Sequence, residues 1–484
     1  MTAINDYESV IGLEVHVQLD TASKIFCGCP TVFGTEPNRN SCPVCLGMPG
    51  SLPVLNERVL ELGIRVGHAL DCQISERVKF DRKNYFYPDL PKAYQISQYD
   101  MPVNGPGFLT IELKDADGQM IERKIRILRA HLEEDAGKLL HEGIEGATLV
   151  DYNRAGIPLL EIVSEPDLRS ADEAYAYLIS LKAILQYLEV SDCNMEEGSL
   201  RCDANVSVRK KGETRLGTKA EIKNLNSFKA VHKSIQYEIE RQVNLVENQE
   251  KVIQETRLWN DVKGQTFTMR SKEEAHDYRY FPEPDLVPFT ISNEMKEKLR
   301  STLPELPRQR SKRFQEKFGL SAYDAAVLVQ EKMTADYFEE CLKAGVPAKL
   351  TSNWLQSELM ALLNEKKTTL KKSPVGPAAL AGLVSLIDKQ TISGKIAKDV
   401  LPIMFETGKS AEAIVKEKGL VQVTDTKQIE EVVERVIAAN PKSVEDFRSG
   451  KTQALSFLVG QIMKETKGKA NPQLANQILE QKLK

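Results

Sequence analysis

Acidic residues and a histidine stand in short apolar segments of the chain, where a sheet could bring them to one face. In IGLEVHVQL, Glu14 and His16 are two residues apart, so a strand would point both side chains the same way. Two later segments, HLEEDAGK and IPLLEIVSEPD, add the carboxylates of Glu133, Glu134, Glu161 and Glu165. Carboxylates and an imidazole in one cleft suit Mg²⁺, which bridges the phosphate oxygens of nucleotides. A lone E-x-H pair is more often a solvated or salt-bridged strand face, and three acidic segments in apolar runs weaken that interpretation without removing it.

A fourth acidic contributor comes from the segment MEEGSLRCDANVSVR. The run LRCDANVSV predicts a strand on which Asp203 faces away from Cys202 and Ala204. Asp203 is therefore a further candidate for the acidic cleft. Neither G-x-x-x-x-G-K-[ST] nor G-x-G-x-x-G is present, so a nucleotide would be held by metal and scattered cations rather than by a phosphate loop.

Cations beside aromatic residues supply the complementary charge. The segment FDRKNYFYPDLPKAYQISQYD interleaves Lys83 and Lys92 with tyrosines and a phenylalanine, and its prolines predict a shaped loop rather than a helix or strand. Such residues suit phosphate contact and base stacking, although a packing loop explains the composition equally well. Further along, Arg270 and Arg279 either hold phosphates or simply finish the sheet.

Four of the eight cysteines are paired by spacing, as Cys27-Gly-Cys29 and Cys42-Pro-Val-Cys45 on turn-rich segments. Two such pairs separated by a short polar loop are typical of a tetrahedral zinc site. Four thiolates leave no open coordination position, so the zinc would be structural and would hold the loop at 27–45.

The elements that must position these residues divide the chain into a mixed part and a helical part. Strands are expected over 7–19, through a meander at 107–145 with a hairpin turn at 117–118, and over 200–208. Helices are expected over 54–70 and after Ser170, which with Glu173 forms a capping box. From about Ile291 helical periodicity dominates. The fold class is therefore α+β, with a mixed domain at 1–293 followed by helical domains at 294–408 and 409–484.

Composition is that of a soluble globular protein, with 41% hydrophobic and 28% charged residues. No apolar run is long enough to span a bilayer and no signal peptide precedes the first strand, so the cytosol is the expected compartment. Net charge is −4, yet basic residues outnumber acidic ones near the C-terminus. This basic tail either contacts a polyanion or is an ordinary solvated face; its candidate contacts are Lys451, Lys464, Lys467 and Lys469.

Several long segments together carry a resemblance to a known family. YESVIGLEVHVQL, FDRKNYFYPDLPKAYQISQYD, HLEEDAGK, IPLLEIVSEPD, MEEGSLRCDANVSVR, EIKNLNSF and DYRYFPEPDLVP closely resemble the B subunit of the bacterial tRNA-dependent amidotransferases (GatB). The match runs from the first strand to the basic tail. Many motifs in order are far more specific than any one of them.

The resemblance implies a heterotrimer with an amidase-type A subunit and a small C subunit. The B subunit of this family uses ATP and Mg²⁺ to phosphorylate the side-chain carboxylate on misacylated tRNA(Gln) or tRNA(Asn), and ammonia from glutamine then displaces the phosphate. The mixed half would be a cradle-shaped domain with this kinase-like site, and the helical parts would hold the tRNA. A tRNA-binding scaffold without catalysis is the alternative, and an independent ligase that uses free ammonia is a third reading.

Carried over motif by motif, the magnesium site would comprise His16, Glu134 and Glu161, with Glu14 and Asp203 near it. The motif position favours Glu134, whereas strand alternation alone leaves Glu133 and Glu134 equally open. By the same resemblance Lys83 and Lys92 would line the site or the ammonia path, and Cys27, Cys29, Cys42 and Cys45 would bind zinc.

Overall fold

The chain forms two compact units that divide between Pro307 and Arg308 in a computed structural model. The structure describes residues 3–115, 117–140, 146–271, 278–420, 426–449, 451, 453–466, 470 and 472–483. The first unit mixes strands and helices and the second is helical, which confirms the mixed N-terminal part and the helical C-terminal part. The finer division at 293 and 408 stays a prediction. Among the described helices, none combines the length and the apolar character needed to cross a membrane.

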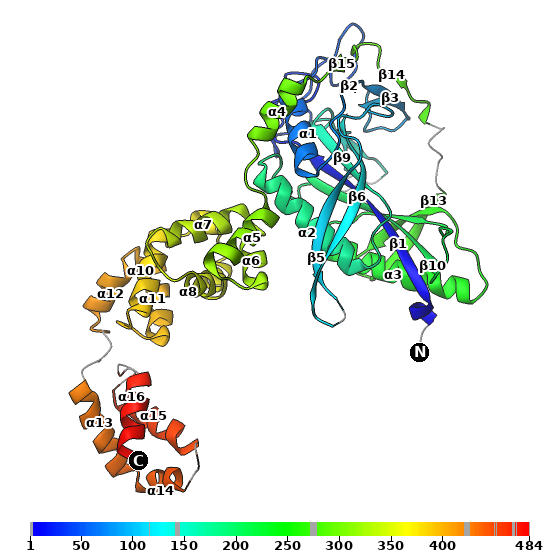
Figure 1. The fold of residues 1–484 in the computed structure, drawn as a ribbon. Coiled ribbons are helices and arrows are strands. Elements are labelled where there is room, and N and C mark those ends of the chain that lie inside the picture. The colour runs from blue at the N-terminus through cyan, green and yellow to red at the C-terminus, as the bar shows by residue number, and fades with distance from the viewer. Residues whose placement is uncertain are drawn as a thin grey trace. The chain divides into compact units, whose positions relative to one another are not determined.

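The first unit is built on an eight-stranded sheet with β1 near its centre (Figure 1). Neighbouring strands are antiparallel except for the parallel pair β11–β12. In spatial order the strands are β13 (Gln265–Ser271), β12 (Glu255–Asn260), β11 (Ala220–Lys223), β10 (Leu200–Lys210), β1 (Tyr7–Gln18), β9 (Pro158–Ser164), β6 (Met120–Glu134) and β5 (Gly107–Lys114).

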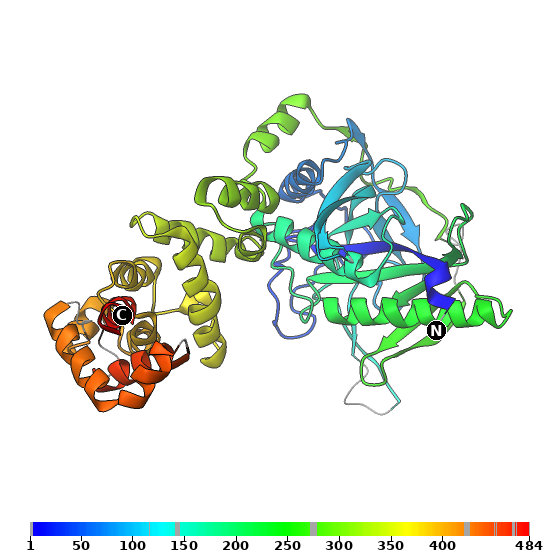
Figure 2. The same ribbon diagram turned by 60° about the horizontal axis from the view of Figure 1, so that its bottom comes forward.

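One face of this sheet is apolar and is covered by helices. The helices α2 (Ala171–Tyr187) and α3 (Phe228–Glu247) contact each other and pack along the sheet, as Figure 2 shows. Leu13, Val15 and Ala204 are fully buried in the resulting core. The helix α1 (Glu57–Ala69) adds to the same core, where Gly63 lies close to Leu132. Because strand side chains alternate, burying these residues turns their polar neighbours to the opposite face.

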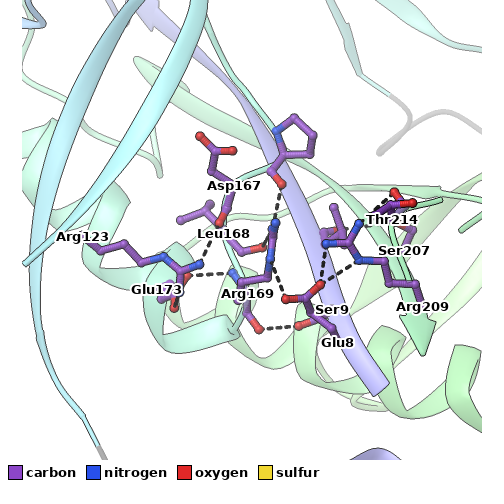
Figure 3. A network of polar contacts seen from close by, with 12 residues as sticks. Glu8, Ser9, Arg123, Asp167, Leu168, Arg169, Glu173, Ser207, Arg209 and Thr214 are labelled. Carbon is purple, nitrogen blue, oxygen red and sulfur yellow. Dashed lines mark hydrogen bonds and ion pairs between the residues drawn. The ribbon is translucent and has the colours of Figure 1, made fainter. Parts of the chain in front are cut away.

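Helix α2 begins at a polar network that differs from the capping box expected from the sequence. The Ser170 hydroxyl accepts the Glu173 N–H, as predicted, but the Glu173 carboxylate accepts the N–H of Arg169 rather than that of Ser170. The same carboxylate also pairs with Arg123 on β6 (Figure 3). Because Arg123 belongs to a strand and Glu173 to the helix, this ion pair also joins the start of α2 to the sheet.

Shorter strands support the loops around the sheet. The segment predicted as a shaped loop contains two paired strands, β3 (Asp81–Asn84) and β4 (Tyr94–Ser97), with Lys83 in the first and Lys92 in the loop between them. The remaining elements of this unit are η1 (Ala3–Asp6), β2 (Arg77–Val78), β7 (Lys138–Leu140), β8 (Leu149–Asp151), β14 (Phe281–Pro282), β15 (Phe289–Thr290) and α4 (Asn293–Ser301).

The second unit contains two separate hydrophobic cores, one between Phe314 and Val415 and the other between Ile429 and Leu483. A single π-helical turn, Trp354–Leu359, separates α8 from α9. The helices run as α5 (Pro307–Phe318), α6 (Ala322–Leu328), α7 (Lys332–Leu342), α8 (Ala348–Asn353), α9 (Met360–Glu365), α10 (Pro377–Asp388), α11 (Gly394–Thr407), α12 (Ala411–Glu417), α13 (Thr426–Ala439), α14 (Pro441–Arg448), α15 (Gln453–Glu465) and α16 (Pro472–Leu483).

Candidate functional site

The polar face of the sheet brings together side chains from three neighbouring strands, β1, β9 and β6. Strand pairing sets His16 on β1 opposite Glu161 on β9, and Glu161 in turn opposite His131 on β6. Glu133 follows His131 by two residues and so lies on the same face. Ligand atoms of His16, Glu133 and Glu161 lie within 4.8 Å of one another, which is close enough for one cation to contact all three.

His131 lies against both carboxylates of this cluster. Its Nε2 lies 3.4 Å from Glu161 Oε2 and 3.6 Å from Glu133 Oε2. The His131 side chain is buried, and its Nδ1 has no hydrogen-bond partner among the described residues. The Ser97 hydroxyl donates to Glu133 over 3.0 Å and holds that carboxylate from another direction. The two carboxylates are therefore oriented before any cation arrives.

Electrostatics keep these carboxyls ionised despite their burial. Burial opposes the charge of Glu161, but the nearby imidazoles of His131 and His16 hold its pKa well below the usual value. The pKa of Glu133 is also lowered, because its hydrogen bond with His131 and the charge of Lys83 outweigh burial and the repulsion from Glu161. Two ionised oxygen ligands beside an imidazole are a donor set that suits a hard divalent cation.

The expected neighbours Glu14 and Asp203 lie on the same face, directly opposite each other on β1 and β10. Asn205 donates to Glu14 over 2.9 Å, and Lys223 pairs with Asp203 over 2.7 Å. Burial and the charges of Glu161, Glu221 and Asp203 raise the pKa of Glu14. The acidic row therefore continues beyond the three clustered ligands and is partly balanced by Lys223.

Glu134, the ligand favoured by motif position, lies on the opposite side of β6 from Glu133. It forms a buried ion pair with Lys92, and its carboxylate accepts the N–H of Ile96 over 2.8 Å. The structure thus joins Glu133, and not Glu134, with His16 and Glu161. Strand alternation is the physical reason, because adjacent residues of a strand cannot share one face.

The predicted phosphate-binding cations are distributed differently. Lys83 stands beside the cluster: Glu133 and Glu161 raise its pKa against the effect of burial, and its Nζ lies 5.0 Å from the centre of the Tyr278 ring. Arg279 is exposed and its carbonyl accepts from Asn84. Arg270 lies on β13, but its side chain is outside the described part of the structure.

The four paired cysteines come together as their spacing predicts. The sulfur atoms of Cys27, Cys29, Cys42 and Cys45 lie within 4.8 Å of one another, a donor set that fits a tetrahedral metal ion. Hydrogen bonding from Cys27, which outweighs burial, lowers the pKa of Cys45 to about 5. A fully buried lysine, Lys24, lies beneath the cluster, and its Nζ is 2.6 Å from the Asn40 carbonyl and 3.8 Å from Cys45 Sγ.

The tail lysines are described only in part. Lys451 is exposed and pairs with Asp446 over 2.8 Å, and Lys464 is exposed at the end of α15. Lys467 and Lys469 lie outside the described residues. The proposed polyanion contact of this tail stays a prediction.

Sequence reasoning missed His131, and motif position favoured Glu134, whereas the clustered carboxylate is that of Glu133. The spacing of His131 and Glu133 matches that of Glu14 and His16, so the same i, i+2 rule could have selected both residues. The pairing of Glu161 opposite His131 could not have been found this way, because it joins two separate strands of the chain.

Comparison with known proteins finds related sequences over both units. Residues 9–297 match the family described as the GatB/GatE catalytic domain, and residues 336–483 match the GatB domain. The chain is 57% identical over 483 residues to the B subunit of the aspartyl/glutamyl-tRNA(Asn/Gln) amidotransferase of Carboxydothermus hydrogenoformans, with 99% of each chain covered. It is 58% identical over 477 residues to the protein of the same name from Thermoanaerobacter sp., again with 99% of each covered. With that of Geobacter sulfurreducens it shares 56% identity over 482 residues, covering 99% of this chain and all of the relative.

Proposed function

The chain belongs to the GatB family, and on that premise we propose that it is the subunit of a tRNA-dependent amidotransferase that activates the misacylated tRNA. It transfers the terminal phosphoryl group of ATP to the side-chain carboxylate of Glu-tRNA(Gln) or Asp-tRNA(Asn). Ammonia then displaces the phosphate and gives Gln-tRNA(Gln) or Asn-tRNA(Asn). The overall reaction is a ligase reaction that forms a carbon–nitrogen bond.

One observation carries this proposal: His16, Glu133 and Glu161 converge on one polar patch with Lys83 beside them. A carboxylate does not react with ammonia because oxide is a poor leaving group, and phosphorylation replaces it with phosphate. Phosphoryl transfer needs positioning and charge stabilisation more than a covalent partner. A row of carboxylates and cations without a nucleophile meets that need.

Each group has a distinct role in this proposal. His16, Glu133 and Glu161 would hold Mg²⁺, which neutralises phosphate charge when bound. Glu14 and Asp203 extend the acidic row for a further contact to the ion or its waters. Lys83 would stabilise the charge of the transferred phosphoryl group, and Arg270 and Arg279 are the proposed further contacts to phosphate. Lys92 and Glu134 lie behind the patch and line the route by which ammonia enters.

The cysteine cluster is proposed to hold structural zinc rather than to take part in the reaction. Its four sulfurs saturate a tetrahedral ion and leave no position for substrate. The nearby Lys24 offsets part of the negative charge that four thiolates would bring. Zinc in this position stabilises a loop that has neither helix nor strand of its own.

The partners follow from the reaction and from the family. An amidase-type A subunit would supply ammonia from glutamine, and a small C subunit would complete a heterotrimer in the cytosol. The mixed unit would form the cradle that holds the acceptor end of the tRNA. Residues 294–408 and 409–484 would form helical domains, the second with Lys451, Lys464, Lys467 and Lys469 toward the tRNA backbone.

The decisive experiment supplies ammonium chloride in place of glutamine, so that the A subunit's chemistry is not needed. The assembled heterotrimer, Glu-tRNA(Gln) and Mg-ATP are mixed, and Gln-tRNA(Gln) is quantified. Glu133→Gln keeps the shape of the side chain and removes its charge, so product formation should fall at least about a hundredfold. Binding of tRNA, measured separately, should be retained.

Glu240→Gln makes the same chemical change at an exposed position of α3 and serves as the matched control. Product formation with this variant should equal that of the unmodified protein. If Glu133→Gln and Glu240→Gln gave equal product, the activation step would lie elsewhere in the complex. The chain would then be the non-catalytic tRNA scaffold, which is the alternative reading.

A further inference from the structure

Residues of the cysteine cluster and of the Lys92–Glu134 ion pair line the same small cavity. The residues around this cavity, of about 60 Å³, include Cys27, Cys45, Gly47, Lys92, Ile96 and Glu134. A direct contact between these two groups would let the loop that carries the cysteines determine where the lysine lies.

Gly47 makes that contact at close range. A Cβ atom at this position would lie 2.3 Å from Lys92 Cγ and 3.1 Å from both Lys92 Cβ and Cδ. These atoms belong to the root of the lysine side chain and not to its flexible end, so a small rotation of the ammonium group cannot relieve the overlap. The stem of Lys92 therefore lies directly against the bare backbone of Gly47.

The far end of Lys92 has little freedom either. Its ammonium group pairs with Glu134, and the Lys92 and Glu134 side chains are only 7% and 4% exposed. The backbone N–H of Ile96 and the side chain of Gln95 fix Glu134 from β4. The Lys92 stem is confined by Gly47 and its ammonium group by Glu134. A shift of the stem would therefore break the Lys92–Glu134 ion pair.

Residues 42–48, here called the second knuckle, are held in shape by local backbone hydrogen bonds. Their hydrogen bonds run within the knuckle, from the N–H groups of Leu46, Gly47 and Met48 to carbonyls of residues 42–44. Cys42 and Cys45 bring the knuckle beside Cys27 and Cys29, and Lys24 lies next to Cys45. A metal ion on the four sulfurs would therefore set the position of Gly47.

We propose that the second knuckle positions Lys92: metal binding at the four cysteines holds Gly47 against the lysine stem and keeps its ammonium group on Glu134. Gly47 is thus a positioning residue that acts through Lys92, and zinc is coupled to the interior of the amidotransferase site. The catalytic consequence rests on the function proposed above.

The first test compares Gly47→Ala with Gly50→Ala in the assembled heterotrimer. Both glycines have positive φ, +64° and +86°, but a Cβ on Gly50 meets no atom within 4 Å. The two variants share the backbone strain and differ in the contact with Lys92. Gly47→Ala should lower ammonium-dependent Gln-tRNA formation about tenfold or more beyond Gly50→Ala. Zinc content should stay at one ion per chain in both variants.

The second test asks whether the effect passes through Lys92. Lys92→Ala removes the Cγ atom with which the new methyl group collides, so Gly47→Ala should have no added effect in that background. Thermal unfolding is measured on the same variants. Gly47→Ala should lower the midpoint about 2–4 °C more than Gly50→Ala does, and this excess should vanish in the Lys92→Ala background.

The third test removes the metal with a chelator and confirms its loss by elemental analysis. The metal-free, unmodified heterotrimer should form Gln-tRNA as slowly as the Gly47→Ala variant does, and added Zn²⁺ should restore its activity. Full activity without zinc would overturn the proposal, and so would an equal loss from Gly47→Ala in the presence and absence of Lys92. Failure of the proposed function would instead appear as unaltered product with Glu133→Gln, while the unfolding measurements would still report on the Gly47–Lys92 contact.

Discussion

At the scale of single residues, the candidate site is a balance between buried charges. Glu133 and Glu161 repel each other, and His131 and Lys83 compensate for that repulsion from within the protein. His16 has its pKa raised by Glu161 against the effect of burial, so a proton occupies the imidazole more readily than usual. A divalent cation must displace that proton, which makes its binding weaker as the pH falls.

Adjacent glutamates on β6 provide an internal comparison for cation binding. Glu133→Gln should weaken binding of Mn²⁺, used as a paramagnetic substitute for Mg²⁺, by about 10–100-fold. Glu134→Gln should leave Mn²⁺ affinity unchanged, because its carboxylate faces Lys92 on the other side of the strand. Electron paramagnetic resonance of free Mn²⁺ measures the Mn²⁺ affinity of both variants. Equal weakening by the two variants would contradict the assignment of Glu133 to the cation.

The cysteine cluster makes a separate prediction about metal content. Cys45→Ser removes the thiol whose pKa is lowered to about 5 by hydrogen bonding from Cys27, and with it one of four ligands. The purified variant should contain little zinc by elemental analysis and should unfold at a lower temperature. Cys341→Ala, in the helical unit, should keep a full complement of zinc. Retention of zinc by Cys45→Ser would show that the sulfurs do not form the site.

At the scale of elements, the sequence predicted which side chains share one face of a strand, but it did not predict which strands pair with each other. The strand containing Glu14 and His16, and the facing of Asp203 away from Cys202, followed from a period of two. The choice between Glu133 and Glu134 needed the partner of β6. That partner is β9, which sets Glu161 opposite His131 and so brings Glu133 to the cluster, a pairing that local composition does not encode.

The start of α2 depends on a network that joins strands to the helix (Figure 3). Glu8 accepts from Arg209 over 2.7 Å and lies 3.2 Å from Arg169, which follows the SEPDL turn. The sequence correctly identified Ser170 as the N-cap. The Glu173 carboxylate, however, pairs with Arg123 on a distant strand instead of closing the capping box. Long-range ion pairs of this kind override a local motif because they satisfy the same carboxylate with a charged donor.

This network predicts a pH-dependent part of the stability. Hydrogen bonding from Arg209 lowers the pKa of Glu8 below its ordinary 4.5, outweighing burial, and Arg169 adds to the effect. A carboxyl with a lowered pKa in the folded state stabilises the fold above the unfolded-state pKa. That contribution is lost as the pH falls through the folded-state value. Glu8→Gln should therefore destabilise the mixed unit by about 1 kcal/mol at pH 7 and by progressively less below pH 4.5.

Tryptophan fluorescence can follow this unit alone. The described chain places Trp259 in the mixed unit and Trp354 in the helical unit, so Trp354→Phe leaves a reporter only where Glu8 lies. Unfolding midpoints of Trp354→Phe, with and without Glu8→Gln, are compared from pH 7 to pH 3. A difference that stayed constant over this range would mean that the Glu8 charge contributes nothing.

At the scale of the whole molecule, chemistry and tRNA binding are expected to separate along the chain. The clustered ligands lie in the mixed unit, whereas the tail has its own hydrophobic core between Ile429 and Leu483. Net charge is −4, so a polyanion must be held by local basic surfaces rather than by the overall field. Substitutions in the tail should then change the affinity for tRNA without changing the rate at saturation.

Lys451 and Lys464 test this separation because both are exposed and distant in sequence from the clustered ligands. Alanine at either position should raise KM for tRNA several-fold, leave kcat unchanged, and reduce the salt dependence of binding by about 0.7–0.9 per lost phosphate contact. Lys251→Ala, at an exposed position after α3, removes the same charge from the mixed unit and is the control. Lys451 shares its charge with Asp446, so its effect should be the smaller of the two tail variants. A lower kcat with an unchanged salt slope would instead mean that the tail acts on the chemistry, and the tail would no longer be a simple holder of the tRNA backbone.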